Sequence, residues 1–558
     1  MPLRHLTPRD RRLFRQYGHG PAVPVPDPLI HHAVERNALA FPHAIAVEHE
    51  GATLTYAQLN GRADALAARL AREGVRPGDH VGLFVRRSTA MVVGLLAVLK
   101  AGAAYVPQDI GITPRGQLDH VVRTAATAVV LTRREHLSKI PPGPRAIVLD
   151  DPCDPRDGSD GSDGFFGDPL GGSFGALPGT PLGAPLRAPL GGSVGDFGGD
   201  SLARAAGPAP AVPRHVTPDD GCYVLFTSGT TGRPNGVKVT HRNVANLLLT
   251  APGDLGIRPG DRVAQLLNIA FDMAAWEILG CLAHGATLVV RGSDLAAAAR
   301  TATVLIATPT VLSAIDPAAC PRVRTVAVAG EPCPRPLADR WARRADFFNC
   351  CGPTETTIVN TMSRHDPAAP LLTIGRPTPN NTVYVLDADR RPLPAGEVGE
   401  MWAGGDCVSE GYLCDEALNA ERYAPDPFLG GGRRMFRTRD LGRWTADGEL
   451  EHLGRTDDQV KVRGFRVELD SVSSVLERIP GCARAVTLRR DARTLVSFVC
   501  PADVDPAAAR RAVAEALPYY CVPEDVMPLP LLPETDRGKI DKQELLRLAQ
   551  ERPAVGAR

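Results

Sequence analysis

The stretch Tyr223–Val237 reads YVLFTSGTTGRPNGV and places a short apolar run directly before a loop of glycines and hydroxyls. The run Tyr223–Phe226 predicts a buried strand. In the loop Thr227–Gly232, glycines let the backbone approach a ligand, and the N–H groups can surround an anion. Arg233 and Lys238 add positive charge nearby. An ordinary turn is the alternative for such a loop alone, and its spacing is not that of a Walker loop.

Bulk properties limit the classes of function. The chain has 558 residues, more than one hydrophobic core usually supports, so at least two domains are expected. A formal net charge of zero gives no reason to expect nucleic acid or an anionic membrane as partner. The N-terminal segment lacks the apolar core of a signal peptide, and no apolar span has transmembrane length. The 12 cysteines form no CxxC pair, which indicates reduced thiols in a cytoplasmic protein.

The order of predicted elements favours an α/β fold, because apolar runs typical of buried parallel strands alternate with helical patterns. A helix is predicted from Thr53 through Leu70 and a second one over Met91–Lys100. The predicted strands are Val81–Val85, Thr287–Arg291, Thr303–Ala307 and Thr325–Ala329.

Between residues 151 and 213 glycine, proline, aspartate, serine and alanine dominate. Such a segment buries too little apolar surface to offset the entropy of ordering it, so we expect a disordered insertion. Its string FGGDSL at Phe197–Leu202 resembles the phosphopantetheine-attachment motif of carrier domains. The sequence around Ser201 cannot form the helical bundle of a carrier, so we interpret the match as chance.

Several further strings occur in a fixed order. They are LTYAQL at 54–59, LKAGAAYVP at 99–107, NCCGPTETT at 349–357, FRTRDL at 436–441, GRTDDQVKVRGFRVEL at 454–469 and RGKID at 537–541. Together with the loop Thr227–Gly232, called the phosphate loop below, they resemble the adenylate-forming superfamily. This superfamily includes acyl-CoA ligases, luciferases and the adenylation domains of nonribosomal peptide synthetases. The resemblance implies a large N-terminal domain of layered sheets and helices over 1–456 and a small, mobile α+β domain over 457–558.

The resemblance also implies ATP and Mg²⁺ and assigns their contacts. Lys539 and Thr354 would contact the reacting phosphate, and Glu355 would hold the metal. The other expected nucleotide contacts are Thr227, Ser228, Gly229, Thr230, Thr231, Gly232, Gly330, Cys350, Cys351, Asp440 and Arg455. Asp457 would be the hinge about which the small domain rotates, and Lys461 would lie on the face used for thioester formation.

Some positions depart from the family's pattern. Cys351 stands in place of the tyrosine that stacks on adenine, Arg439 in place of the glycine before Asp440, His452 in place of a tyrosine, and Asn235 in place of a lysine. Loss of the aromatic face would weaken ATP binding. The departures indicate weaker nucleotide binding or an enzyme that depends on a partner.

The substrate class depends on Asp272 in FDMAAWE, which resembles the carboxylate that pairs with an α-ammonium group. By the same resemblance the side-chain pocket is lined by Met273, Trp276, Ile306, Ala327, Ala329, Cys350, Ile358 and Val359. None of these is charged, which predicts a hydrophobic α-amino acid.

We therefore expect an enzyme that makes aminoacyl-AMP and passes the amino acid as a thioester to a carrier protein acting in trans. A CoA ligase for acyl or aryl acids is the first alternative, and a non-catalytic interaction protein is the second. The amino acid, the carrier, the final product, the oligomeric state and the need for a small helper protein stay open at this stage.

Overall fold

The computed structural model describes residues 3–149, 216–227, 233–456, 459–462, 465–491, 493–533 and 540–551. Several sequence predictions lie outside these ranges. They are the disordered insertion with Ser201, the loop Ser228–Gly232, the hinge Asp457 and the lysine Lys539.

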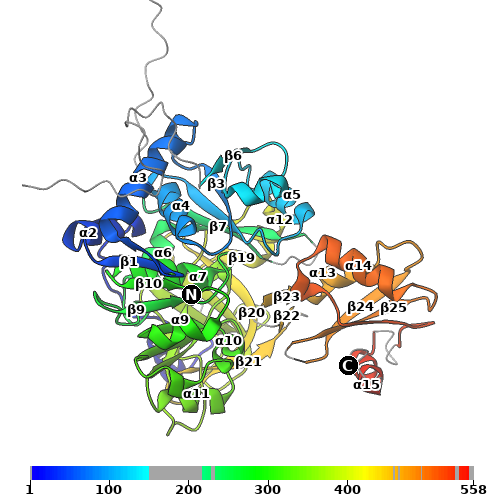
Figure 1. Ribbon diagram of the computed structural model, residues 1–558. Helices are drawn as coiled ribbons and strands as arrows, with labels where there is room; N and C mark the ends of the chain where they lie inside the picture. Colours follow the sequence, from blue (N-terminus) through cyan, green and yellow to red (C-terminus); the bar gives the residue numbers. More distant parts are fainter. Residues whose placement is uncertain are drawn as a thin grey trace, which may run out of the picture. The chain divides into compact units, whose positions relative to one another are not determined.

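The largest sheet is mostly parallel, and Figure 1 shows its strands β1, β10 and β9 next to one another. Its central strands β13, β12, β11, β9, β10 and β1 all run parallel, and three antiparallel strands flank them. In spatial order the strands are β15 (Arg376–Pro377), β14 (Thr361–Arg364), β13 (Asp346–Cys351), β12 (Thr325–Val328), β11 (Val304–Ala307), β9 (Arg262–Gln265), β10 (Thr287–Val290), β1 (Ile45–His49) and β2 (Ala52–Thr55).

A second sheet contains the strand that precedes the phosphate loop. Strand β7 pairs antiparallel with β8 and parallel with β4, and β4, β3, β5 and β6 continue in parallel. In spatial order the strands are β18 (Gly411–Tyr412), β8 (Asn235–Thr240), β7 (Gly221–Thr227), β4 (Ala104–Gln108), β3 (His80–Phe84), β5 (Val129–Thr132) and β6 (Arg145–Val148).

Helix α4 (Thr89–Lys100) joins the two sheets. Every residue from Ala90 to Leu99 is buried, as expected for a helix that is apolar on all sides. It contacts β3 and β4 of one sheet and β1 of the other, and α3 (Tyr56–Arg72) lies beside it (Figure 1). Helix α3 begins with a capping box in which Thr55 and Gln58 bond each other's backbone N–H groups.

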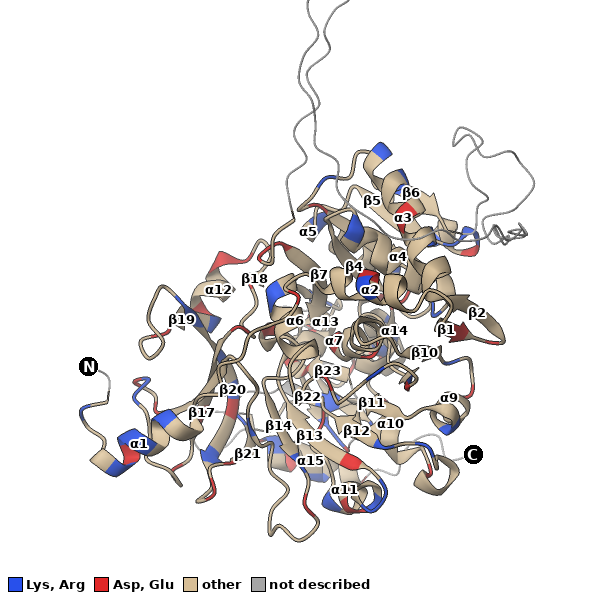
Figure 2. Cartoon of the chain, turned by 90° about the vertical axis from the view of Figure 1, so that its left-hand side faces the viewer, with Lys and Arg blue, Asp and Glu red and all other residues tan. Residues whose placement is uncertain are grey.

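The other helices of residues 3–456 cover the sheets or fill the connections between strands. The N-terminal α1 is rich in arginine, and Figure 2 shows these residues as blue segments along the helix. These helices are α1 (Pro8–Tyr17), α2 (Ile30–Ala40), α5 (Arg115–Thr124), α6 (His241–Leu248), α7 (Asp272–Ala275), α8 (Cys281–Ala283), α9 (Leu295–Thr301), α10 (Pro309–Ser313), α11 (Arg335–Ala342) and α12 (Glu416–Arg422).

A third sheet is antiparallel and carries the predicted ribose contact Asp440. It pairs β16 (Asn381–Leu386), β17 (Gly399–Gly405), β20 (Arg434–Trp444) and β19 (Tyr423–Pro425), and β21 (Leu450–Arg455) also pairs with β20.

Residues 459–551 form separate sheets with hydrophobic clusters of their own. The elements are β22 (Gln459–Val462), β23 (Phe465–Glu468), α13 (Leu469–Leu476), β24 (Arg484–Arg489), β25 (Leu495–Cys500), α14 (Pro506–Ala516), β26 (Asp525–Pro528) and α15 (Lys542–Glu551). The predicted α/β fold, with layered sheets and a smaller C-terminal α+β part, is confirmed. Within the described ranges, no helix is both long and apolar enough to cross a membrane.

Candidate active site

A cavity of about 280 Å³ lies at the carboxyl ends of parallel strands from both large sheets. Gly352, Gly330 and Thr308 follow β13, β12 and β11 of the first sheet, and all three border the cavity. Asp109 and Thr227, at the ends of β4 and β7, border it from the second sheet. Ligands of open parallel sheets bind at this edge, so the cavity is the candidate site.

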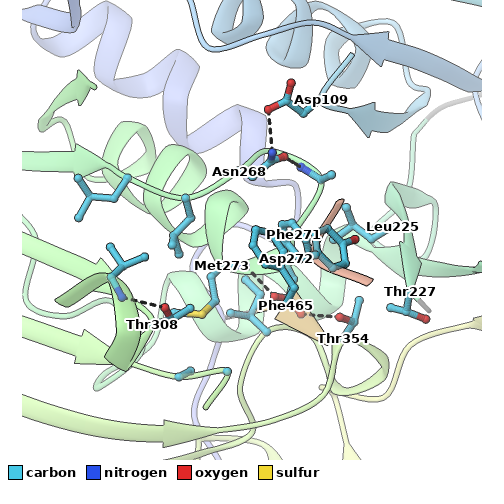
Figure 3. Close-up of a pocket in the computed structure, with 18 of the residues that line it drawn as sticks. Asp109, Leu225, Thr227, Asn268, Phe271, Asp272, Met273, Thr308, Thr354 and Phe465 are labelled. Carbon is cyan, nitrogen blue, oxygen red and sulfur yellow. Dashed lines mark hydrogen bonds between the residues drawn. The ribbon is translucent and has the colours of Figure 1, made fainter. Parts of the chain in front are cut away.

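Asp272 and Thr354 meet in this cavity although they come from distant motifs. The hydroxyl Oγ1 of Thr354 donates to Oδ2 of Asp272 at 2.7 Å (Figure 3). The other oxygen, Oδ1, accepts the backbone N–H of Met273 at 2.7 Å. Burial raises the pKa of Asp272, and the hydrogen bond from Thr354 and the charge of Lys461 oppose this rise only in part. A cationic ligand group would stabilise the ionised carboxylate.

Glu355 lies next to Thr354 but does not border the cavity. Its side chain is fully buried, and its Oε1 accepts the hydroxyl of Tyr412 at 2.6 Å. Among the described residues, no cluster of three or more His, Cys, Asp or Glu side chains could hold a metal ion. Mg²⁺ commonly uses one or two carboxylates together with substrate phosphates, so the carboxylate of Glu355 suits this ion by ligand type, while its side chain is buried against Tyr412 in this structure.

The predicted ribose contact Asp440 is buried in β20 and paired with the predicted nucleotide contact Arg455. Nη1 of Arg455 donates to Oδ1 of Asp440 at 2.6 Å, and Nε2 of His452 lies 3.4 Å from the same oxygen. Burial raises the pKa of Asp440, but the hydrogen bond from His452 and the charge of Arg455 outweigh it, so the pKa lies below its usual value. His452, which stands where the family's pattern has a tyrosine, thus stabilises the ionised form of Asp440. Arg439, before it, has a φ of 62°, in the left-handed region that favours glycine.

Cys351 is half-buried near the Asp440–Arg455 pair. Burial raises the pKa of its thiol to about 12, and the charges of Asp440 and Arg455 also act on the thiol. Cys350, the next residue back along β13, is fully within the core. Neither cysteine borders the cavity, whereas the predicted contacts Gly330 and Thr227 do.

The predicted side-chain pocket is only partly formed. Met273, Ala329 and Ile358 border the cavity together with Asp272. The other predicted wall residues, Trp276, Ile306, Ala327, Cys350 and Val359, are buried in the core and do not border it.

One contact holds Trp276 in the core. The indole N–H of Trp276 donates to the main-chain oxygen of Gly253 at 2.8 Å. Met273 itself borders the cavity, and its sulfur lies 3.7 Å from the position that a Cβ would take at Gly330. The cavity therefore contains only part of the predicted uncharged wall.

The cavity instead extends toward polar side chains that sequence reasoning missed. Arg87, Asp109, Asn268 and Arg291 border it, and Nδ2 of Asn268 donates to Oδ2 of Asp109 at 2.7 Å (Figure 3). Arg87 lies two residues after the predicted strand Val81–Val85, and Arg291 ends the predicted strand Thr287–Arg291. The rule that ligands bind at the carboxyl ends of parallel strands would have identified these two arginines from the sequence.

Aromatic side chains of the C-terminal part border the same cavity. The ring of Phe465 lies 5.0 Å from the ring of Phe271 and stacks on Tyr520 at 4.1 Å between centroids. Lys461, predicted to lie on the thioester-forming face, also borders the cavity. The strand pair β22–β23 therefore brings both a lysine and an aromatic ring to the site.

The layered sheets, and the cavity beside the loop GPTE at residues 352–355, define an adenylate-forming enzyme of the kind found in nonribosomal peptide synthetases. The chain belongs to the AMP-binding enzyme family, which matches residues 34–413. Enzymes of this family use ATP.

Two curated relatives and one solved structure illustrate the similarity. The chain is 42% identical over 554 residues to adenylate-forming reductase 03009 of Coprinopsis cinerea, covering 98% of this chain and 49% of that protein. It is 35% identical to novobiocin biosynthesis protein H of Streptomyces niveus, covering 94% and 83% respectively. The chain spans about half the length of the Coprinopsis relative.

The fold resembles that of NpsA-ThdA, an artificially fused adenylation-PCP di-domain from Klebsiella oxytoca. The TM-score is 0.71 at 22% identity, and the match covers 94% of this chain and 96% of that one.

Proposed function

We propose that this chain activates a carboxylic acid with ATP and transfers the acyl group to the phosphopantetheine thiol of a carrier protein acting in trans. The α-amino acids are the first candidate class. The observation that carries the proposal is the meeting of Asp272 and Thr354 in a cavity at the carboxyl edge of the sheets, with Glu355 directly beside them.

In the first step, an oxygen of the substrate carboxylate attacks the α-phosphorus of ATP. The bond from that phosphorus to the bridging oxygen breaks, and pyrophosphate leaves with the bonding electron pair. In this proposal the hydroxyl of Thr354 would orient the α-phosphate, and Lys539 would neutralise the developing charge. Glu355 would hold Mg²⁺ together with the phosphates, and the bound ion supplies positive charge for the transfer.

In the second step, the thiolate of the carrier attacks the acyl carbon, and AMP leaves with the electrons of the broken C–O bond. Lys461 and Phe465 belong to the strand pair that borders the cavity, and we assign this pair to the thioester-forming arrangement. Rotation about Asp457 would then exchange Lys539 for this face.

Asp272 supports an amino acid as substrate, because a half-buried carboxylate with a raised pKa gains from a cationic partner. A second candidate is an acid without an α-amino group whose thioester is later reduced. The similarity to the Coprinopsis reductases and the arginines in the cavity favour this candidate. CoA is the alternative acceptor of the acyl group.

Trapping the adenylate with hydroxylamine tests both candidates. The protein is incubated with ATP, Mg²⁺ and single acids, namely amino acids and their deaminated analogues, and the hydroxamates are quantified. If the substrate is an amino acid, Asp272→Ala should abolish hydroxamate formation from amino acids and spare the analogues. Asp366→Ala, on an exposed turn, is the matched control. Equal loss with both classes of acid would argue against the ammonium contact.

A further inference from the structure

The end of the cavity remote from Thr354 carries two arginines from different sheets. Arg87 follows β3, and Arg291 follows β10, which lies four strands along the sheet from β13. Both side chains border the cavity. The main-chain oxygen of Leu266 accepts one N–H of Arg87 at 3.0 Å.

Neither guanidinium is fully satisfied by the protein. The Nε atoms of Arg87 and Arg291 are both buried, and no acceptor among the described residues reaches either one. A buried donor without an acceptor destabilises the protein, because its hydrogen bond to water is lost and not replaced. A ligand in the cavity that offers acceptors to both Nε–H groups would remove this penalty at each arginine.

The nearby carboxylates are engaged elsewhere. Oδ2 of Asp109 accepts from Asn268, and its Oδ1 accepts the N–H of Gly111 at 2.9 Å. Glu277, fully buried behind the cavity, accepts the backbone N–H groups of Leu266 and Leu267 at 2.8 and 3.2 Å. These acids therefore leave the Nε–H groups of the arginines without a partner.

The electrostatics agree with this geometry. Burial and the neighbouring charge of Arg291 lower the pKa of Arg87 to about 10, so Arg87 stays protonated at neutral pH. Burial raises the pKa of Glu277 to about 8, so most of its population is uncharged at pH 7. The two guanidinium charges are then only partly balanced by Asp109.

We infer that Arg87 and Arg291 form a subsite for an anionic group, a carboxylate or a phosphate, on the ligand that occupies the cavity. The inference rests on the proposed function, because two ligands of that reaction can bring such a group. One source is a second carboxylate at the far end of the acid substrate, and the other is the phosphate of the phosphopantetheine arm. Guanidinium binds both groups through paired N–H donors.

Calorimetric titration without ATP tests the subsite directly and distinguishes the two sources. The first probe set is a homologous series of α,ω-dicarboxylic acids with the monocarboxylic acids of equal chain length. The second is 4′-phosphopantetheine with pantetheine. In one set the anionic member should bind about 10-fold more tightly than its partner, the equivalent of one charge-assisted hydrogen bond. The set that discriminates identifies the source.

Arg291→Met should reduce this affinity ratio to about one, since it removes the guanidinium charge and keeps an unbranched side chain. Arg86→Met is the matched control, because Arg86 is exposed beside Arg87 and does not border the cavity, so it should keep the full ratio. Thermal unfolding of each variant verifies the fold, and Arg87→Met provides an independent second removal of charge. The inference is wrong if neither probe set discriminates, or if both substitutions in the cavity keep the discrimination.

Hydroxamate trapping on the same protein separates this inference from the proposed function. Adenylate formation with no preference for anionic probes would overturn the subsite alone. Discriminating binding without adenylate formation from any acid would contradict the proposed function and leave the subsite in place.

Discussion

The hydroxyl of Thr354 donates to the carboxylate of Asp272 at 2.7 Å, across 82 positions of the sequence. A threonine hydroxyl has a single proton, so it cannot donate to Asp272 and to a phosphate oxygen at once. A substrate that brings its own donors to Asp272 would release this proton for the α-phosphate. If the proposed roles hold, we expect the pair to couple occupation of the acid site to binding of the nucleotide.

Thr354→Val should lower kcat/KM for adenylation by about 10- to 100-fold, since a hydrogen bond to a charged group contributes about 1.5–3 kcal/mol. It should also raise the pKa of Asp272 further, because the hydrogen bond from Thr354 lowers that pKa. If the substrate is an amino acid, the acidic limb of the pH–rate profile then moves to higher pH. Thr354→Ser keeps the donor and should restore both values. An unchanged profile in the valine variant would contradict the coupling.

Cys351→Tyr should lower the KM for ATP, because a ring at this position would offer adenine a stacking face. Aromatic pairs contribute about 0.5–1.5 kcal/mol beyond the free energy of burying their surface, so we expect the KM to fall about 2- to 10-fold. Cys351→Ala removes the thiol without adding a ring and should leave the KM unchanged. A KM that stays the same or rises in the tyrosine variant would show that adenine lies elsewhere.

The sequence predicted the elements of the fold well because their signals are local. The apolar run before the phosphate loop became β7, and the pattern from Thr53 through Leu70 became α3 with its capping box. The site was predicted less completely. Asp272, Met273 and Thr354 all border the cavity, but the position of Trp276 depends on an acceptor at Gly253, 23 residues earlier in the chain. No local pattern reports such a contact.

Arg439→Gly should yield a more stable protein than Arg439→Ala by about 1 kcal/mol. Both variants lose the ion pair with Glu421, and only glycine adopts the observed φ of 62° without steric cost. Comparing the urea midpoints of the two variants isolates the backbone effect. Equal midpoints would mean that the strain is relieved by movement of the strand.

Two buried histidines should make the fold sensitive to acid. Burial lowers the pKa of His31 and of His241 from 6.5 to about 3 in each case, and nearby His32 and Lys100 add positive charge while Asp220 opposes it. The unfolded chain binds protons on these two histidines more readily than the folded chain does. The contribution of the neutral histidines to the free energy of unfolding is therefore complete above pH 6.5 and is lost progressively down to about pH 3.

At pH 5 each histidine should lower the free energy of unfolding by about 2 kcal/mol relative to pH 7. His241→Leu should remove roughly half of this pH dependence, whereas His43→Gln, on the surface, should keep it. Urea midpoints at the two pH values measure the effect. Full acid sensitivity in the leucine variant would exclude His241 as a cause.

ATP–pyrophosphate exchange over a panel of carboxylic acids measures directly whether this chain forms an acyl-adenylate. We predict exchange that depends on one class of acid, and a loss of about two to three orders of magnitude in Lys539→Ala, the scale expected when a preorganised charge at the transition state is removed. Lys542→Ala, on the nearby helix α15, should retain exchange. No exchange with any acid, or near-normal exchange in Lys539→Ala, would contradict the account.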